Sequence, residues 1–193
     1  MLDELPRAEL DKMSGGGRHQ GAIALAPELA MRRLQELSLG DDALIVALDE
    51  LQDPQNFGAV IRSAAAMGAT AVVWPEHKSA PLSPATFRAS AGAVEHATLC
   101  RVPSLPAALE SLRSRGVAPM GLDAAADQAI HNADLRGPVA LVVGAEGKGL
   151  RKSVKRACSA LVRLPMPGPI ESLNASAAVA IALYEAVRQR TAP

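Results

Sequence analysis

The fold class follows from residues 43–74, which read ALIVALDELQDPQNFGAVIRSAAAMGATAVVW. The continuous apolar run at the start of this stretch is typical of a strand buried in a parallel sheet. The Asp53-Pro54 turn then opens a helix that closes at Gly68. We predict a strand, a helix and a second strand over 43–49, 56–68 and 69–74. This order indicates an α/β sheet.

The alternation continues to the end of the chain. Further strands are predicted over 97–102, 117–122, 138–144 and 160–164, and further helices near 84–91, 104–115, 149–156 and 174–190. This pattern favours a mostly parallel sheet with helices on both faces. The segment PMPGPIESL (165–173) contains three prolines, which donate no backbone hydrogen bond, so we expect it to stay irregular.

The first forty residues differ from the rest. The segment SGGGRHQG (14–21) is typical of a flexible linker, and the run before it is too short for a core of its own. With 193 residues in total, one domain is expected rather than two large ones. We therefore divide the chain into a tail and connecting segment over 1–39 and an α/β domain over 40–193.

Composition disfavours several classes of protein. Twenty Lys and Arg balance twenty Asp and Glu, so no global positive field points to a polyanionic partner. The aromatic residues, two Phe, one Trp and one Tyr, are too few for a surface that stacks several bases. The isolated cysteines Cys100 and Cys158 indicate neither a disulfide framework nor a zinc site. Without a leader-like or membrane-spanning apolar run, the chain is expected to be cytoplasmic.

Charge is unevenly distributed along the chain. Residues 1–60 hold 11 acids and 5 bases, whereas residues 123–193 hold 6 acids and 9 bases. Four members of the densest basic run have a spacing that would place them on one helical face, namely Lys148, Arg151, Lys152 and Lys155. That face is either solvated surface or a line of contacts to nucleic-acid phosphates.

Polar residues follow several predicted strands, where open α/β sheets bind their ligands. Asn56 enters the helix after the first strand, and Arg62 follows almost two turns later. Because helical side chains lean toward the helix N-terminus, we expect Arg62 to run over Gly58 toward the strand end. The alternative is an ordinary N-cap at Asn56 and a surface arginine.

Two more groups lie toward the C-terminus. The loop in LVVGAEGKGL (141–150) indicates close approach of backbone to a ligand, but GKG (147–149) lacks the Ser or Thr of a P-loop, which disfavours a nucleoside triphosphatase. Glu146 in this loop is either a site carboxylate or an exposed turn residue. Ser172 and Asn174 precede a helix of small residues, and they either serve a site or cap the helix.

Taken together, these motifs resemble a known family. An Asn-x5-Arg helix start, a GAEGxG loop and a Pro-rich loop ending in SLN are similar, in order and spacing, to the three motifs of the SpoU (TrmH-like) branch of the SPOUT RNA 2′-O-ribose methyltransferases. The resemblance covers residues 43–190. SGGGRHQG and the closing LYEAVRQR (183–190) are most similar to the subgroup that methylates a guanosine ribose in bacterial 23S ribosomal RNA. That subgroup carries an RNA-binding domain ahead of such a segment, so 1–39 is expected to be its remnant or linker.

The resemblance implies a fold and a cofactor. The C-terminal part of the sheet would be threaded into a deep trefoil knot, a rare exception to unknotted topology. S-adenosylmethionine would bind in the knot, held mostly by backbone groups, and no metal would be needed. The positions that match its binding residues are Gly121, Leu122, Gly144, Leu164 and Leu173.

The resemblance also implies a catalytic site. Arg62 matches the catalytic arginine of the family; because a guanidinium is a poor general base, we expect it to hold a phosphate and stabilise the developing alkoxide. The remaining polar site positions match Asn56, Glu146, Ser172 and Asn174. The four basic residues named above are expected to contact RNA. A homodimer formed through the small-residue face of the last helix would complete the RNA site.

Other functions stay open on the sequence. A tRNA ribose methyltransferase shares the same three motifs. A knotted domain that binds RNA without turnover would be favoured by loss of Arg62 or of the GAEG loop, and both are present. A nucleotide-dependent dehydrogenase is disfavoured because no GxGxxG follows the first strand.

Overall fold

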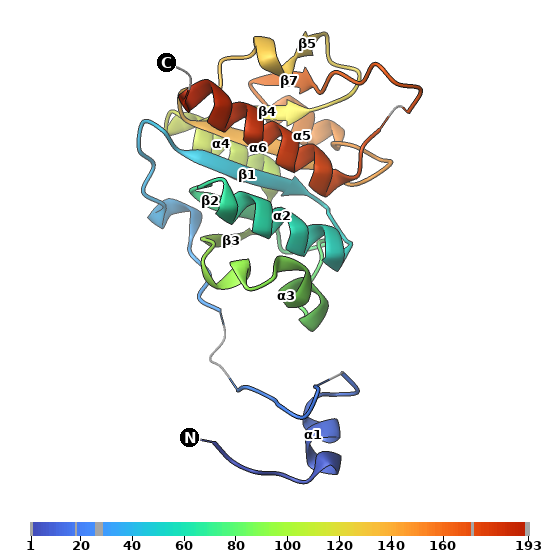
Figure 1. Cartoon of the computed structure of the whole chain (residues 1–193). Coiled ribbons are helices and arrows are strands. Elements are labelled where there is room, and N and C mark those ends of the chain that lie inside the picture. Colours follow the sequence, from blue (N-terminus) through green and yellow to red (C-terminus); the bar gives the residue numbers. More distant parts are fainter. Residues whose placement is uncertain (1, 18, 26–28, 171, 192–193) are drawn as a thin grey trace. The chain divides into compact units, whose positions relative to one another are not determined.

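Figure 1 shows the chain as a computed structural model, which describes residues 2–17, 19–25, 29–170 and 172–191. These residues form two units, divided between Ala30 and Met31. The first unit contains α1 (Arg7–Met13), which buries none of its side chains. The second unit contains the sheet and the other helices. Within the described ranges, no helix is both long and apolar enough to cross a membrane.

The second unit is built on a parallel sheet. In the described part of the chain the sheet has seven strands in the order β3-β2-β1-β6-β4-β7-β5, and all paired strands run parallel. Their bounds are β1 (Leu44–Asp49), β2 (Ala71–Pro75), β3 (Leu99–Val102), β4 (Ala118–Leu122), β5 (Gln128–Ala129), β6 (Val139–Gly144) and β7 (Ala160–Arg163). The predicted strands are confirmed, whereas no pattern predicts β5, because two residues are too few to show one.

Helices cover both faces of the sheet, as predicted. Their bounds are α2 (Pro54–Ala66), α3 (Pro84–Ser90), α4 (Leu105–Ser114), α5 (Lys152–Ala157) and α6 (Ala175–Thr191). In Figure 1, α2 and α6 pass in front of the strands, and α4 and α5 lie behind them. α2 packs against both α3 and α6, while α4 packs against α5. Three short 3-10 turns occur among the described residues, at Leu34–Glu36, Ala93–Glu95 and Ile130–Asn132.

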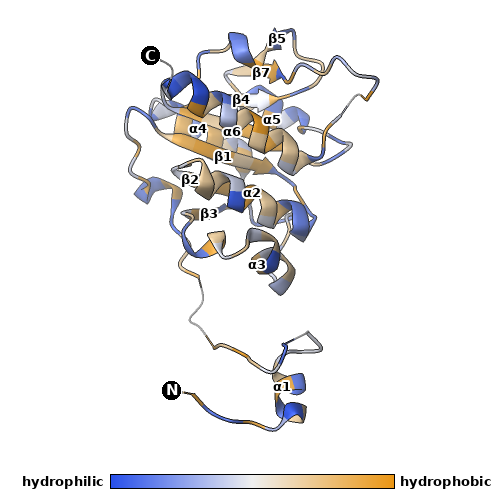
Figure 2. Ribbon diagram, in the orientation of Figure 1, coloured by the Kyte–Doolittle hydropathy of each residue, from blue (hydrophilic) through white to orange (hydrophobic). Residues whose placement is uncertain are grey.

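The core lies between the sheet and these helices. The central strands β1 and β6 bury every one of their residues. On the face covered by α4 and α5, Ile45, Ala47 and Val142 pack with Leu105 and Leu109 of α4 in one apolar cluster. Figure 2 shows that apolar residues are concentrated along the strands. A rigid sheet therefore supports the loops at its strand ends.

α2 begins two residues earlier than predicted. The Asp53 carboxylate caps this helix by accepting the backbone N–H groups of Gln55 and Asn56 at 3.2 and 3.1 Å. Pro54 takes the first helical position, where its missing N–H costs nothing. Asn56 therefore lies inside the first turn, and the alternative that it is the N-cap is wrong. Its side-chain amide is left available for other contacts.

Arg190, near the end of α6, ties the helix to two strand entrances. Its guanidinium donates hydrogen bonds to the carbonyl oxygens of Leu135, Asp42 and Gly137 at 2.9, 2.6 and 2.8 Å. Partial burial lowers the pKa of Arg190 from its ordinary value. The residue holds the starts of β1 and β6 together through carbonyl groups alone.

Replacing Arg190 with Met is expected to lower the free energy of unfolding by about 2–4 kcal/mol, because several carbonyl groups lose charged donors. Urea unfolding monitored by circular dichroism measures the loss. Arg113→Met is the matched control: Arg113 is exposed on α4, so its change should stay within about 0.5 kcal/mol. Equal losses in the two variants would contradict the role assigned to Arg190.

Candidate active site

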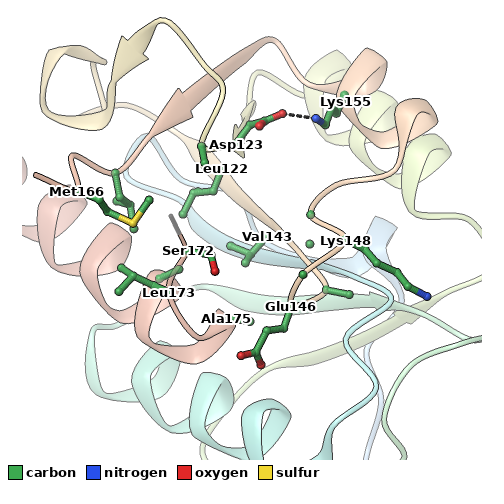
Figure 3. A pocket seen from close by; sticks show the side chains of 17 residues that line it. Leu122, Asp123, Val143, Glu146, Lys148, Lys155, Met166, Ser172, Leu173 and Ala175 are labelled. Atoms are coloured by element: carbon green, nitrogen blue, oxygen red, sulfur yellow. Dashed lines mark ion pairs between the residues drawn. The ribbon is translucent and has the colours of Figure 1, made fainter. Parts of the chain in front are cut away.

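A cavity of about 320 Å³ opens at the carboxyl ends of β4 and β6. The loop after β6 and the irregular segment before α6 complete its walls (Figure 3). Four of the five residues predicted to bind the cofactor line this cavity, namely Leu122, Gly144, Leu164 and Leu173. The fifth, Gly121, does not line it. A Cβ at Gly121 would lie 2.7 Å from Leu161 and 2.8 Å from Leu150, so this glycine serves packing behind the wall.

The glycine-rich loop folds back tightly onto the end of β6. Gly149 donates its backbone N–H to the Ala145 carbonyl oxygen at 2.9 Å, and these two residues form an isolated bridge. A Cβ at Gly144 would lie 2.1 Å from the carbonyl carbon of Gly149, so no side chain fits there. Gly147 and Gly149 have φ values of +75° and +62°, a conformation that favours glycine. The glycines are thus needed to form the wall of the cavity.

Three predicted polar residues meet at one end of the cavity. Asn174 donates to the Oδ1 atom of Asn56 at 2.8 Å, and Asn56 donates to the Oε2 atom of Glu146 at 3.4 Å. Asn174 also reaches the same Glu146 oxygen at 3.5 Å. The three side chains come from α2, the loop after β6 and the entrance of α6. Two amides are therefore directed at one carboxylate, which holds it in place.

Ser176 belongs to this cluster, although the sequence interpretation missed it. Its hydroxyl donates to the Oδ1 atom of Asn174 at 2.6 Å, and it lies 3.5 Å from Oδ1 of Asn56. Asn174 additionally caps α6 by accepting the backbone N–H of Ser176 at 2.9 Å. The sequence feature that points to Ser176 is its place two positions after Asn174, which makes it a second hydroxyl residue near the start of α6. The predicted Ser172 lines the cavity (Figure 3).

Arg62 lies apart from this cluster. It is exposed on α2, and no hydrogen bond or ion pair joins its side chain to another described residue. It is six residues from Asn56, so about 9 Å farther along the helix and on a different side. The predicted path of Arg62 over Gly58 is wrong, because α3 fills that space: a Cβ on Gly58 would lie 2.5 Å from the Thr86 carbonyl oxygen.

The predicted basic helical face is also wrong. α5 begins only at Lys152, with Arg151 as its N-cap in an extended conformation (ψ 151°). Lys148 lies in the preceding loop, where Gly147 and Gly149 adopt positive φ and prevent a helix. In Figure 3 the Lys148 side chain points away from the cavity.

Two of the four basic residues are held in ion pairs. Arg151 pairs with Asp49 and with Glu50. Lys155 pairs with Asp123 on the cavity wall, and its hydrogen bond lowers the pKa of the Asp123 carboxyl. Figure 3 shows this pair at the opposite end of the cavity from Glu146. Lys148 and Lys152 are exposed and form no ion pair within the described ranges.

Among its described residues, the site offers polar groups for holding and orienting a hydroxyl, and no activated thiol nucleophile. Burial raises the pKa values of Cys100 and of Cys158 to about 11, so both thiols stay protonated at neutral pH. Among the described residues, no group of three His, Cys, Asp or Glu side chains could hold a metal ion. A largely apolar cavity lined at one end by a carboxylate that two amides contact suits an organic cofactor and a hydroxyl substrate.

Comparison with known proteins places this geometry in context. The model of the SpoU rRNA Methylase family matches residues 43–184. The chain is 45% identical over 187 residues to the 23S rRNA (guanosine-2′-O-)-methyltransferase RlmB of Xanthomonas campestris pv. campestris, covering 94% of this chain and 75% of that protein. It is 42% identical over 192 residues to an uncharacterized tRNA/rRNA methyltransferase of Mycolicibacterium smegmatis, covering 97% of this chain and 61% of the relative. It thus spans about three fifths of that relative's length.

The fold of this chain also matches that of solved structures. The SpoU methyltransferase AviRb from Streptomyces viridochromogenes, solved in complex with the cofactor AdoMet, superposes with a TM-score of 0.76 and 33% identity. The match covers 81% of this chain and 61% of that structure.

Proposed function

The chain belongs to the SpoU rRNA methylase family, and we propose that it transfers a methyl group from S-adenosylmethionine to a ribose 2′-hydroxyl of RNA. The observation that carries this proposal is the meeting of Asn56, Glu146 and Asn174 at one end of the cavity. The first candidate target is a guanosine of 23S rRNA, the substrate in the name of the relative that is 45% identical. This target implies a cytoplasmic location.

The cavity fits S-adenosylmethionine, which carries the transferable methyl group on a sulfonium. Leu122, Leu164 and Leu173 give the cavity an apolar wall suited to a flat ring, and Gly144 lets the backbone of the glycine-rich loop pack closely against the end of β6. The AviRb complex with AdoMet supports the choice of cofactor. Gly121 contributes by packing behind this wall, and no metal is included in the proposal.

The residues at the catalytic end would orient the substrate. The amides of Asn56 and Asn174 hold the Oε2 atom of Glu146, which leaves its Oε1 atom to accept a hydrogen bond from a ribose hydroxyl. Ser172, on the cavity wall, can contact the same sugar. The Arg62 guanidinium, on another side of α2, would act on the RNA in the site that a second copy of the chain completes, where it would hold the adjacent phosphate and stabilise the alkoxide as the proton leaves. Positioning of this kind supplies a large part of the rate in methyl transfer.

The contacts to RNA would come from exposed cations in and just after the glycine-rich loop. Lys148, within the glycine-rich loop, and Lys152, at the start of α5, are exposed and suit phosphate groups. Residues 40–193 would form the methyltransferase domain, with the C-terminal strands threaded into a trefoil knot, and residues 1–39 would lead into it. The insertion of β4 between β6 and β7 supports a non-sequential path of this kind. Arg18 and residues 26–28 of the leading segment, like Glu171 of the irregular loop, lie outside the described residues.

Calorimetric titration with S-adenosylmethionine tests the cofactor directly. One molecule is expected to bind per chain, whereas NAD and ATP should give no heat of binding. Titration with a 23S rRNA fragment and with tRNA then separates the two substrates. RNA binding without any cofactor binding would favour a non-catalytic RNA-binding module instead.

A homodimer would complete the site. α6 exposes Ile181 and Tyr184 at 45% and 59%, and the neighbouring Leu173 is exposed at 38%. Exposed large apolar side chains of this kind suit contact with a second copy of the chain. A partner would also approach the α2 surface, where Arg62 has no contact of its own within the described ranges.

Light scattering measures this association. The wild-type chain is expected to have the mass of a dimer at micromolar concentration, and Ile181→Asp/Tyr184→Asp should be monomeric because each copy would bury two charges in the interface. Arg113→Asp, an exposed change on α4, is the control and should remain dimeric. A monomeric wild type would contradict the proposal.

A further inference from the structure

We infer that Arg151 is a positioning residue, which through an ion pair with the buried carboxylate of Asp49 holds the loop of Glu146 against the segment that carries Asn56. The inference rests on the proposed function, because it concerns the geometry of the same site. It replaces the direct RNA contact that the sequence suggested for Arg151.

A single arginine satisfies the whole Asp49 carboxylate. Asp49 is the last residue of β1, and its side chain is fully buried. Its Oδ1 atom accepts from Nε and Nη2 of Arg151 at 2.7 and 2.6 Å, and its Oδ2 atom accepts the backbone N–H of Arg151 at 2.8 Å. Arg151 thus fixes its own backbone as well as its side chain to the end of β1.

A second carboxylate strengthens this arrangement. Glu50 pairs with the Nη1 atom of Arg151 at 2.9 Å and lies 3.6 Å from the Nζ atom of Lys78. Glu50 has a φ of +56°, a left-handed conformation that is rare for a side chain of this size. Such a conformation persists where surrounding contacts enforce it. Arg151 therefore bridges two consecutive carboxylates at the point where β1 turns toward α2.

The ion pair joins the two segments that meet in the polar cluster. Asp49 is four residues before Asp53, the N-cap of α2, and so fixes the start of the helix that carries Asn56. Arg151 is five residues after Glu146, and the intervening Leu150 is buried. Fixing both ends fixes the distance between the Asn56 amide and the Glu146 carboxylate. A shift of about 1 Å in such a site can lower a rate by about 100-fold.

The chemistry of arginine is required at this position. Nε, Nη1 and Nη2 form a rigid fork that meets two carboxylates at once, whereas a lysine offers one ammonium group. If Arg151 turned to an RNA phosphate, Asp49 would remain buried and unpaired, which is strongly unfavourable. Lys152, the next residue, is exposed and forms no ion pair within the described ranges, so its contact with a phosphate would leave no buried carboxylate unpaired.

The test compares Arg151→Met, Arg151→Lys and Asp49→Asn with Arg113→Met, an exposed control on α4. Turnover is measured at saturating S-adenosylmethionine and RNA, well below the melting temperature of each variant. We expect kcat to fall by at least about 30-fold in all three variants, since each loosens the site. The double variant Asp49→Asn/Arg151→Met should lose no more than either single one, because both act through one interaction.

RNA affinity as a function of salt separates positioning from RNA contact. For Arg151→Met, the slope of log K against log[salt] should equal that of the wild type, whereas Lys152→Met should lower the slope by about one unit. A reduced slope with unchanged kcat in Arg151→Met would overturn the inference, as would losses that multiply in the double variant. So would unfolding of all three variants, seen by circular dichroism, because the pair would then serve stability alone.

Failure of the proposed function gives a different result. If the wild type transfers no methyl group, the proposed activity fails. The role of the ion pair is then tested by measuring the affinity of each variant for S-adenosylhomocysteine by calorimetry. In that case Arg151→Lys and Asp49→Asn should both bind S-adenosylhomocysteine at least about tenfold more weakly than Arg113→Met, because the loop forms part of the cavity wall. Equal affinities would overturn the inference.

Discussion

Arg62→Ala is expected to lower methyl transfer to RNA by at least about 100-fold, the loss typical of removing one donor to a developing oxyanion. Arg62 does not line the cavity, so binding of S-adenosylmethionine should change by less than about twofold. Transfer is measured with labelled cofactor at saturating RNA, and binding by calorimetry on the same preparation. The contrast between the two readouts is what identifies a catalytic role.

Arg88→Ala is the matched control for this variant. Arg88 is an exposed arginine on the neighbouring helix α3, so removing it takes away a similar charge without touching α2. Its turnover should stay within about twofold of the wild type, since surface changes are usually mild. Near-normal turnover in Arg62→Ala would contradict the role assigned to Arg62.

Gly144→Ala is the second change with a large expected effect. The added Cβ would lie 2.1 Å from the carbonyl carbon of Gly149 and 2.5 Å from the Leu150 nitrogen, so the loop must move away from β6. Overpacking of this kind costs about 1–3 kcal/mol, equivalent to roughly 5- to 150-fold in cofactor affinity if the strain falls on the loop. Calorimetry with S-adenosylmethionine measures the affinity, and urea unfolding measures any loss of stability.

Gly137→Ala is the control for this prediction. An added Cβ at Gly137 meets no atom within 4 Å, and this glycine does not line the cavity. Its cofactor affinity and stability should match those of the wild type. If Gly144→Ala bound S-adenosylmethionine as tightly as Gly137→Ala does, the loop would not form the cofactor wall.

The sheet could be predicted from the sequence because its signals are local. The buried run of β1, the Asp-Pro turn and the closing Gly68 lie next to one another, and each has a single physical meaning. The start of α5 could not be predicted from charge spacing. Gly147 and Gly149 have positive φ because the loop folds back on β6, and that contact depends on the packed structure.

In the polar site, too, some features could be predicted from the sequence and others depend on the packed structure. Asn56, Glu146 and Asn174 could be grouped in advance because each follows a strand, and parallel strands end at the same edge. The pairing of Asp49 with Arg151 joins residues 102 positions apart, so no local pattern indicates it. Gly58 illustrates the opposite error, since a position that suggested room for Arg62 is filled by α3.

Mapping of the methylated position tests the central claim most directly. The purified chain is incubated with S-adenosylmethionine and unmodified 23S rRNA, and 2′-O-methyl groups are located by their resistance to alkaline cleavage, with tRNA as the parallel substrate. The proposed function predicts one new 2′-O-methylated guanosine in the 23S rRNA, absent with Arg62→Ala. If the chain binds both the RNA and the cofactor but the RNA gains no ribose methyl group, the proposed function is contradicted.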